Sequence, residues 1–180
     1  KFPDFRPRKI LVVASGNSVI NEENRIQEFI KNNNPVVISM NHLPKTLEVD
    51  HVFFSNQLRF NQYSEEIDIS KIIVTSNIVK KYLDKLPFTI DYDRLINRNN
   101  ITSDNVTMLF INKLVNEGYT ELFIAGLDGY SVNNENYSYQ ENYKNDDKNV
   151  LESLNNDISK SLSILEKRIK ISLITTSIFK

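Results

Sequence analysis

The chain has 180 residues, 40% of them hydrophobic, and its 22 lysines and arginines nearly balance 23 aspartates and glutamates, giving a formal net charge of −1. This length supports one substantial core, so we expect a single domain over residues 1–180, and the balanced charge excludes a general preference for nucleic acid or an anionic membrane surface. The absence of cysteine excludes disulfides, thiolate nucleophiles and zinc–thiolate sites, and no apolar run approaches the roughly 20 residues that a membrane helix needs.

Apolar runs that end in polar residues predict four buried strands in the first half of the chain. They cover residues 9–14, 35–40, 51–54 and 71–75. Between the first two, apolar residues recur at helical spacing, at positions 20, 26, 29 and 30. The order strand, tight turn, helix is therefore predicted at the start of the chain.

The second half begins with an irregular stretch and then alternates helix and strand. Residues 85–100 contain Pro87 and predict an irregular connection, and a helix follows with Thr102 and Ser103 as N-cap candidates and Gly118 as its end. The remaining elements are a strand at 122–125, an exposed polar loop at 132–149, a helix at 151–168 and a strand at 169–174. This alternation predicts an α/β fold, a Rossmann-like three-layer sandwich with a mainly parallel sheet.

The two ends of the chain predict a domain excised from the C-terminal part of a longer protein. Lys1 stands where a complete protein would have methionine, and the last strand pattern runs almost to Lys180. The first residues contain no apolar signal segment, so a cytoplasmic location is expected.

Polar residues follow the predicted strands where an open α/β sheet binds ligands. Asn41, Asn56 and Asn77 each follow a strand, and in a parallel sheet they would gather at one edge. An amide offers both a donor and an acceptor, which suits a base edge or a ribose hydroxyl. Asparagine is also common at turns for backbone reasons alone, so a structural role is the alternative for each.

Two glycine-containing turns lie beside this edge. The first, Ser15-Gly16-Asn17-Ser18, would let a phosphate approach the backbone, and the second, Gly126 to Tyr130, carries Asp128. The first turn lacks the three glycines of a dinucleotide fingerprint and the lysine of a P-loop, so neither NAD nor a triphosphate is expected. A plain strand-to-helix turn is the alternative.

Other groups favour little chemistry by themselves. His42 is expected to be a solvated loop residue and His51 an inward strand residue. Asp91 and Asp93 lack neighbouring acids, so no metal site is predicted. The tyrosines of the polar region could donate to a departing phosphate or simply cover a surface.

The segments ILVVASGNSV, VVISMN, HVFFSN and TSDNVTMLFINKLVNEGYTELFIAGLDGY resemble, in order, the bacterial sialyltransferases and the related motility accessory proteins. The resemblance implies metal-independent, inverting transfer of sialic acid from CMP-sialic acid. It places nucleotide recognition on Ser15, Gly16, Asn41, Asn56 and Ser103, and the leaving phosphate between Tyr130 and Tyr137; we add Asn17, Ser18, Gly126 and Asp128 as neighbours. The family's histidine base has no counterpart after His51, so Glu152 is the substitute candidate, and Asn17 replaces the family's turn proline.

GLDGYS with the upstream segments FFSNQLRF and VTSNI resembles the domain that follows the barrel in HMG-CoA-lyase-type 4-hydroxy-2-oxovalerate aldolases. This resemblance implies a role in surface-polysaccharide synthesis, an aldolase barrel elsewhere in the same longer chain, and an accessory domain that binds CMP, another nucleotide or a nucleotide sugar. An active CMP-sugar glycosyltransferase and a structural or partner-docking domain with a vestigial site are the alternatives. A homo-oligomer is compatible with each.

Overall fold

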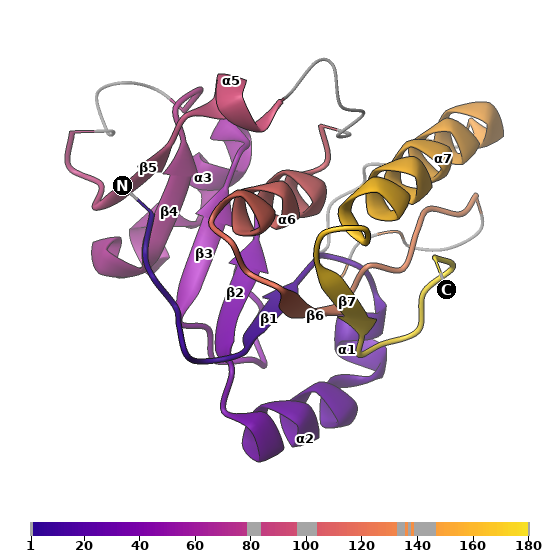
Figure 1. The fold of residues 1–180 in the computed structure, drawn as a ribbon, viewed down its shortest axis with the longest axis horizontal. Coiled ribbons are helices and arrows are strands. Elements are labelled where there is room, and N and C mark those ends of the chain that lie inside the picture. The colour runs from indigo at the N-terminus through magenta and orange to yellow at the C-terminus, as the bar shows by residue number, and fades with distance from the viewer. Residues whose placement is uncertain are drawn as a thin grey trace.

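The computed structural model describes residues 2–78, 84–96, 104–132, 136, 138 and 147–179. In this part of the chain seven strands form one sheet in the order β5-β4-β3-β2-β1-β6-β7, and all neighbouring strands are parallel (Figure 1). The strands are β1 (Ile10–Val13), β2 (Val36–Met40), β3 (His51–Phe54), β4 (Ile72–Thr75), β5 (Phe88–Ile90), β6 (Glu121–Ala125) and β7 (Lys170–Leu173). The predicted α/β, Rossmann-like fold with a parallel sheet is confirmed.

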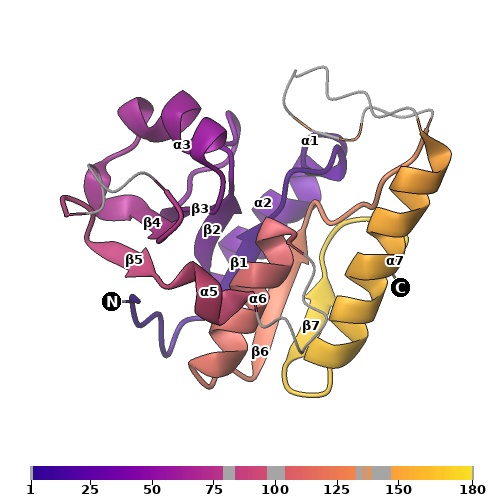
Figure 2. The ribbon, with the colours of Figure 1, turned by 90° about the horizontal axis from the view of Figure 1, so that it is seen from above.

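Helices cover both faces of the sheet, so the fold has three layers (Figures 1 and 2). One core cluster joins Val12 and Phe53 to α5 (Tyr92–Leu95), α6 (Val106–Asn116) and α7 (Lys148–Leu165). The other joins Val13 and Phe54 to α1 (Ser18–Asn21), α2 (Glu23–Asn33) and α3 (Gln57–Tyr63). Two 3-10 turns, η1 (Ser64–Glu66) and η2 (Ile69–Lys71), follow α3. Strands buried on both faces explain the nearly continuous apolar runs of the sequence.

Local signals explain where the longer helices begin and end. Asn105 caps α6, because its side chain accepts hydrogen bonds from two backbone N–H groups of the first turn. The expected N-caps, Thr102 and Ser103, lie outside the described residues, and the helix begins after Asn105 instead. Asn34 ends α2 in the left-handed conformation, with φ of 44°.

Three further expectations differ from the structure. The stretch 85–100 was expected to be irregular, but β5 and α5 lie within it. The single helical pattern after β1 forms two consecutive helices, α1 and α2. His42 is not a solvated loop residue, since only 2% of its surface is exposed.

The strand order places a topological switch beside β1. The chain adds β2, β3, β4 and β5 on one side of β1 and then returns to add β6 and β7 on the other. Connections on either side of such a point diverge, which opens a crevice at the carboxyl ends of the strands. The candidate site is therefore expected above β1, β2 and β6.

Candidate functional site

A cleft of about 580 Å³ lies at the carboxyl ends of the strands, and we call it the strand-end cleft. Turns after β1, β2, β3 and β6 form its floor and one side, and the start of α6 and part of α7 form the other. It brings together several of the predicted site residues, namely Ser15, Gly16, Asn41, Asn56, Gly126, Asp128 and Tyr130. The switch point of the sheet and the cleft therefore coincide.

Other predicted residues lie elsewhere. Asn17 and Ser18 line a neighbouring cavity rather than the cleft. Glu152 lies on α7 but does not line the cleft; 59% of its side chain is exposed, and it forms an ion pair of 3.6 Å with Lys148. Ser103 and Tyr137 lie outside the described residues.

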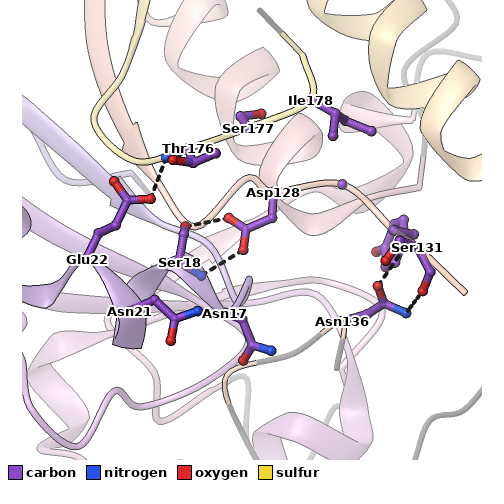
Figure 3. A pocket seen from close by; sticks show the side chains of 12 residues that line it. Asn17, Ser18, Asn21, Glu22, Asp128, Ser131, Asn136, Thr176, Ser177 and Ile178 are labelled. Atoms are coloured by element: carbon purple, nitrogen blue, oxygen red, sulfur yellow. Dashed lines mark hydrogen bonds between the residues drawn. The ribbon is translucent and has the colours of Figure 1, made fainter. Parts of the chain in front are cut away.

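The turn after β1 is closed by a carboxylate of the protein itself. Asp128 Oδ2 accepts a hydrogen bond of 2.7 Å from the backbone N–H of Ser18, and Asp128 Oδ1 accepts one of 2.5 Å from Ser18 Oγ (Figure 3). Ser18 Oγ also shares a hydrogen bond of 2.7 Å with Thr175 Oγ1. A phosphate bound to this turn would need the same donors, so the position expected for an anion is held by Asp128.

Gly16 is needed for this internal contact. A Cβ atom at Gly16 would lie 2.5 Å from Asp128 Cγ and 2.5 Å from the carbonyl oxygen of Gly126. The Gly16 N–H donates to that same carbonyl oxygen at 2.8 Å. The glycine thus lets two turns of the protein approach each other, which is a structural reason for it that requires no ligand.

The strand-end asparagines are partly used by the backbone. Asn41 Oδ1 accepts from Ser55 N–H at 3.0 Å, and Asn56 Oδ1 caps α3 by accepting from Arg59 N–H at 3.2 Å. No described residue takes the side-chain N–H donors of Asn41 and Asn56, so both amides present donors at the cleft. Asn77 does not line the cleft; it bonds to Thr75 and to the backbone of Ser55 instead.

The charges of the cleft limit the ligand it can hold. Among its described lining residues the only cation is Arg59, against the carboxylates of Asp104, Asp128 and Asp157. Such a lining opposes a highly charged anion, and a ligand with one or two phosphates would have to place them beside Arg59. Asp104 also accepts a hydrogen bond of 2.7 Å from Tyr92 Oη; burial and this bond raise the pKa of Tyr92 to about 12.

Tyr130 is positioned by a residue that the sequence did not single out. The backbone N–H of Tyr130 donates to Asn155 Oδ1, and Asn155 Nδ2 donates to the Tyr130 carbonyl, both at 2.9 Å. The tyrosine ring packs partly against the core and lines the cleft. Asn155 lies in an asparagine-rich stretch, so the sequence does not distinguish it from its neighbours. Arg59 follows a strand-end asparagine by about one helical turn, and this position is a sequence signal for a residue of the cleft.

Neither histidine lines the cleft. Burial lowers the pKa of His42 to about 4, so its ring is neutral at pH 7. Its Nδ1 lies 3.0 Å from the carbonyl oxygen of Met40. His51 is half-buried between Phe5 and Phe88, as expected of an inward strand residue, and burial lowers its pKa as well. Both act as structural residues in this geometry.

Metal clusters, membrane-spanning helices and similarity to known proteins would each indicate a class of protein. Within the described ranges no cluster of three or more His, Asp or Glu side chains has metal-binding geometry. The helices described there include none with the length and apolar character to cross a bilayer. Comparison with protein-family models, with curated proteins and with solved structures found no match for this chain.

Proposed function

We propose that this domain binds a nucleotide or nucleotide sugar in the strand-end cleft, as the accessory domain of a longer protein. The observation that carries the proposal is the cleft at the switch point, where the amide donors of Asn41 and Asn56 stand beside Arg59. Amide donors match the acceptor atoms of a pyrimidine base or ribose, and a guanidinium matches a phosphate. CMP is the first ligand to test, because the sialyltransferase resemblance implies a cytidine nucleotide.

The phosphate position in this proposal differs from the one expected from sequence. Asp128 already takes the donors of the Gly16 turn, so the proposal places the phosphate near Arg59 and the start of α6. The N-terminal end of the 11-residue α6 lies at the cleft, and its cap, Asn105, is neutral, so the backbone donors of its first turn contribute beside Arg59, while the preceding Asp104 adds a carboxylate at the same end.

The decisive variant is Asn56→Asp. Aspartate caps a helix as well as asparagine does, so α3 keeps its cap, while the donor nitrogen at the cleft becomes a carboxylate oxygen. We expect CMP affinity to fall by about tenfold, equivalent to about 1.4 kcal/mol, as measured by calorimetric titration. Asn61→Asp on the same helix makes the same charge change outside the cleft and should bind CMP like the wild type.

A second variant separates phosphate from base recognition. Arg59→Gln should weaken CMP and leave cytidine unchanged, because only CMP carries the phosphate that a guanidinium binds. Unchanged CMP affinity in both Asn56→Asp and Arg59→Gln would refute the cleft as the nucleotide site.

The glycosyltransferase alternative needs a base at the cleft, and a carboxylate is the candidate. Asp157 lines the cleft from α7, whereas Glu152 does not. In an inverting transfer, a carboxylate would accept the proton of the acceptor hydroxyl as that oxygen bonds to the sugar and CMP departs. Turnover of CMP-sialic acid that is lost in Asp157→Asn and retained in Glu152→Gln would support this activity.

The link to an aldolase barrel and to surface-polysaccharide synthesis is supported by the sequence resemblance of FFSNQLRF, VTSNI and GLDGYS. An aldolase partner in the same chain would leave the carbonyl chemistry to the barrel. CMP added to the longer protein should then shift the signals of this domain. Aldol cleavage by the barrel is measured in a separate assay.

A further inference from the structure

A second cavity, of about 640 Å³, opens beside α1, and we call it the α1 cavity. Its walls are α1 with the first residue after it, the segment 128–131, and the C-terminal segment 176–178 (Figure 3). It shares four lining residues with the strand-end cleft, namely Asp128, Gly129, Tyr130 and Asn136. The two cavities therefore adjoin at residues 128–130.

Hydrogen bonds join the walls of the α1 cavity to one another. Glu22 Oε1 accepts from the Thr176 N–H at 2.8 Å, and the Ile178 N–H donates to the Asp128 carbonyl at 3.1 Å. Ser177 Oγ donates to the carbonyl oxygen of Leu127. A cavity whose walls are linked in this way exists before any ligand arrives, as most small-molecule sites do.

The opposite wall is fixed by two asparagine side chains. Asn136 Oδ1 accepts from the Ser131 N–H at 2.8 Å, and its Nδ2 donates to the Ser131 carbonyl at 3.0 Å (Figure 3). Asn155 makes the equivalent pair of bonds to Tyr130. The backbone of Tyr130, which lines both cavities, is thereby fixed.

The chemistry of the lining selects a class of ligand. The side chains that face the cavity are amides, hydroxyls and two carboxylates, Glu22 and Asp128, and no lysine or arginine is among the described lining residues. Burial opposes ionisation of Glu22, but hydrogen bonds from Thr176 and Arg25 outweigh it and lower the pKa of its carboxyl. The cavity thus presents amide and hydroxyl groups together with two carboxylates, and it disfavours anions.

Sugar hydroxyls both donate and accept, and a sugar ring has apolar faces. Asn17 and Asn21 supply amide groups on one side of the cavity (Figure 3). Tyr130 and Ile178 also line it and supply apolar surface, and 61% of the surface of Ile178 is exposed. We propose that the α1 cavity binds a neutral saccharide of one or two residues, next to the strand-end cleft. The saccharide site goes beyond the nucleotide proposal, and either can hold without the other.

The test is a two-dimensional NMR titration of the 15N-labelled domain, in which the two sites have separate reporters. Glucose, galactose, N-acetylglucosamine and lactose, each up to tens of millimolar, should shift the resonances of Asn21, Thr176 and Ile178. CMP should instead shift those of Asn41 and Asn56. Failure of CMP alone would count against the nucleotide proposal and leave the saccharide site intact.

Matched probes and variants sharpen the saccharide result. Glucuronate should bind at least several-fold more weakly than glucose, because it adds one carboxylate to a cavity that already has two. Asn21→Ala should reduce the sugar-induced shifts, whereas Asn24→Ala, an exposed amide on α2 that lines neither cavity, should not. Both positions are exposed, so both variants should keep the wild-type spectrum without ligand.

Two results would overturn the saccharide site. One is the absence of shifts at Asn21, Thr176 and Ile178 with every neutral sugar of the panel. The other is a stronger response to cadaverine, a diamine without hydroxyl groups, because the cavity would then be a cation site that uses Glu22 and Asp128.

Discussion

Replacement of Asp128 by asparagine tests whether a charged carboxylate closes the first turn of the fold. The side chain keeps its shape, but the amide has a single acceptor oxygen. That oxygen accepts a neutral bond from the Ser18 N–H, and the amide nitrogen can only donate to Ser18 Oγ, so the second bond reverses and is neutral as well. Bonds to charged groups contribute about 1.5–3 kcal/mol and neutral ones about 0.5–1.5 kcal/mol, so two bonds differ by about 2 kcal/mol. Asp128 is half-buried, and solvent screening reduces this difference to about 1–2 kcal/mol.

Urea unfolding followed by circular dichroism measures this change. For 180 residues, a loss of about 1–2 kcal/mol lowers the melting temperature by about 3–6 °C and moves the urea midpoint without changing the slope. Ser18→Ala and the double variant complete a cycle, and we expect a coupling energy of about 1 kcal/mol because the two residues share one hydrogen bond between side chains. Asp157→Asn removes a cleft carboxylate and should leave the midpoint nearly unchanged. Wild-type stability of Asp128→Asn with an additive cycle would refute the role of the carboxylate.

Other substitutions test single features of the same structure. Gly16→Ala should lower the free energy of unfolding in urea by about 2–3 kcal/mol, because its Cβ would overlap the carboxylate of Asp128. Gly118→Ala has free space for its Cβ but a φ of 82°, so it should lower the free energy of unfolding by only about 1 kcal/mol. The pKa of His42 is about 4 in the folded protein and 6.5 in the unfolded chain, so protonation favours unfolding. The free energy of unfolding should therefore fall by about 3 kcal/mol as the pH decreases from 6.5 to 4. His42→Gln should make the urea midpoint depend less on pH over this range. Asn155→Ala should speed amide hydrogen exchange at Tyr130, because it removes the acceptor of that N–H; wild-type exchange there would contradict the positioning role.

Most of the fold was readable from the sequence because its strands are central and parallel. Runs such as Ile10–Val13 are buried on both faces, which leaves an apolar pattern that no surface element shares. The edge strand Phe88–Ile90 has three residues, two of them half-buried, and a proline directly before it, so its local pattern is too short to identify. Strand β5 is stabilised by pairing with β4, which only the tertiary structure shows.

The sequence also predicted where the cleft lies. It did not predict that a carboxylate of the protein itself, Asp128, takes the hydrogen-bond donors of the first turn. Strand ends and glycine turns follow from order along the chain, and these predict a polar edge at Asn41 and Asn56. That Asp128 bonds to Ser18 depends on two turns that are 110 residues apart and meet in space. The same holds for His42, a polar residue next to a strand end that folds back onto Ser39 and Met40 and is buried.

The internal carboxylate changes what the first turn can do, and this leads to a functional prediction. In many α/β folds the turn after the first strand gives its N–H groups to a phosphate, whereas here Asp128 receives them and adds a negative charge to the cleft. If Asp128 acts only within the protein, Asp128→Asn should bind CMP several-fold more tightly, leave cytidine unchanged, and lose the gain at high salt. Calorimetric titration at two salt concentrations measures this. Loss of binding of both CMP and cytidine would instead mean that the carboxylate contacts the nucleoside, since removal of a mere repulsion cannot weaken an uncharged ligand.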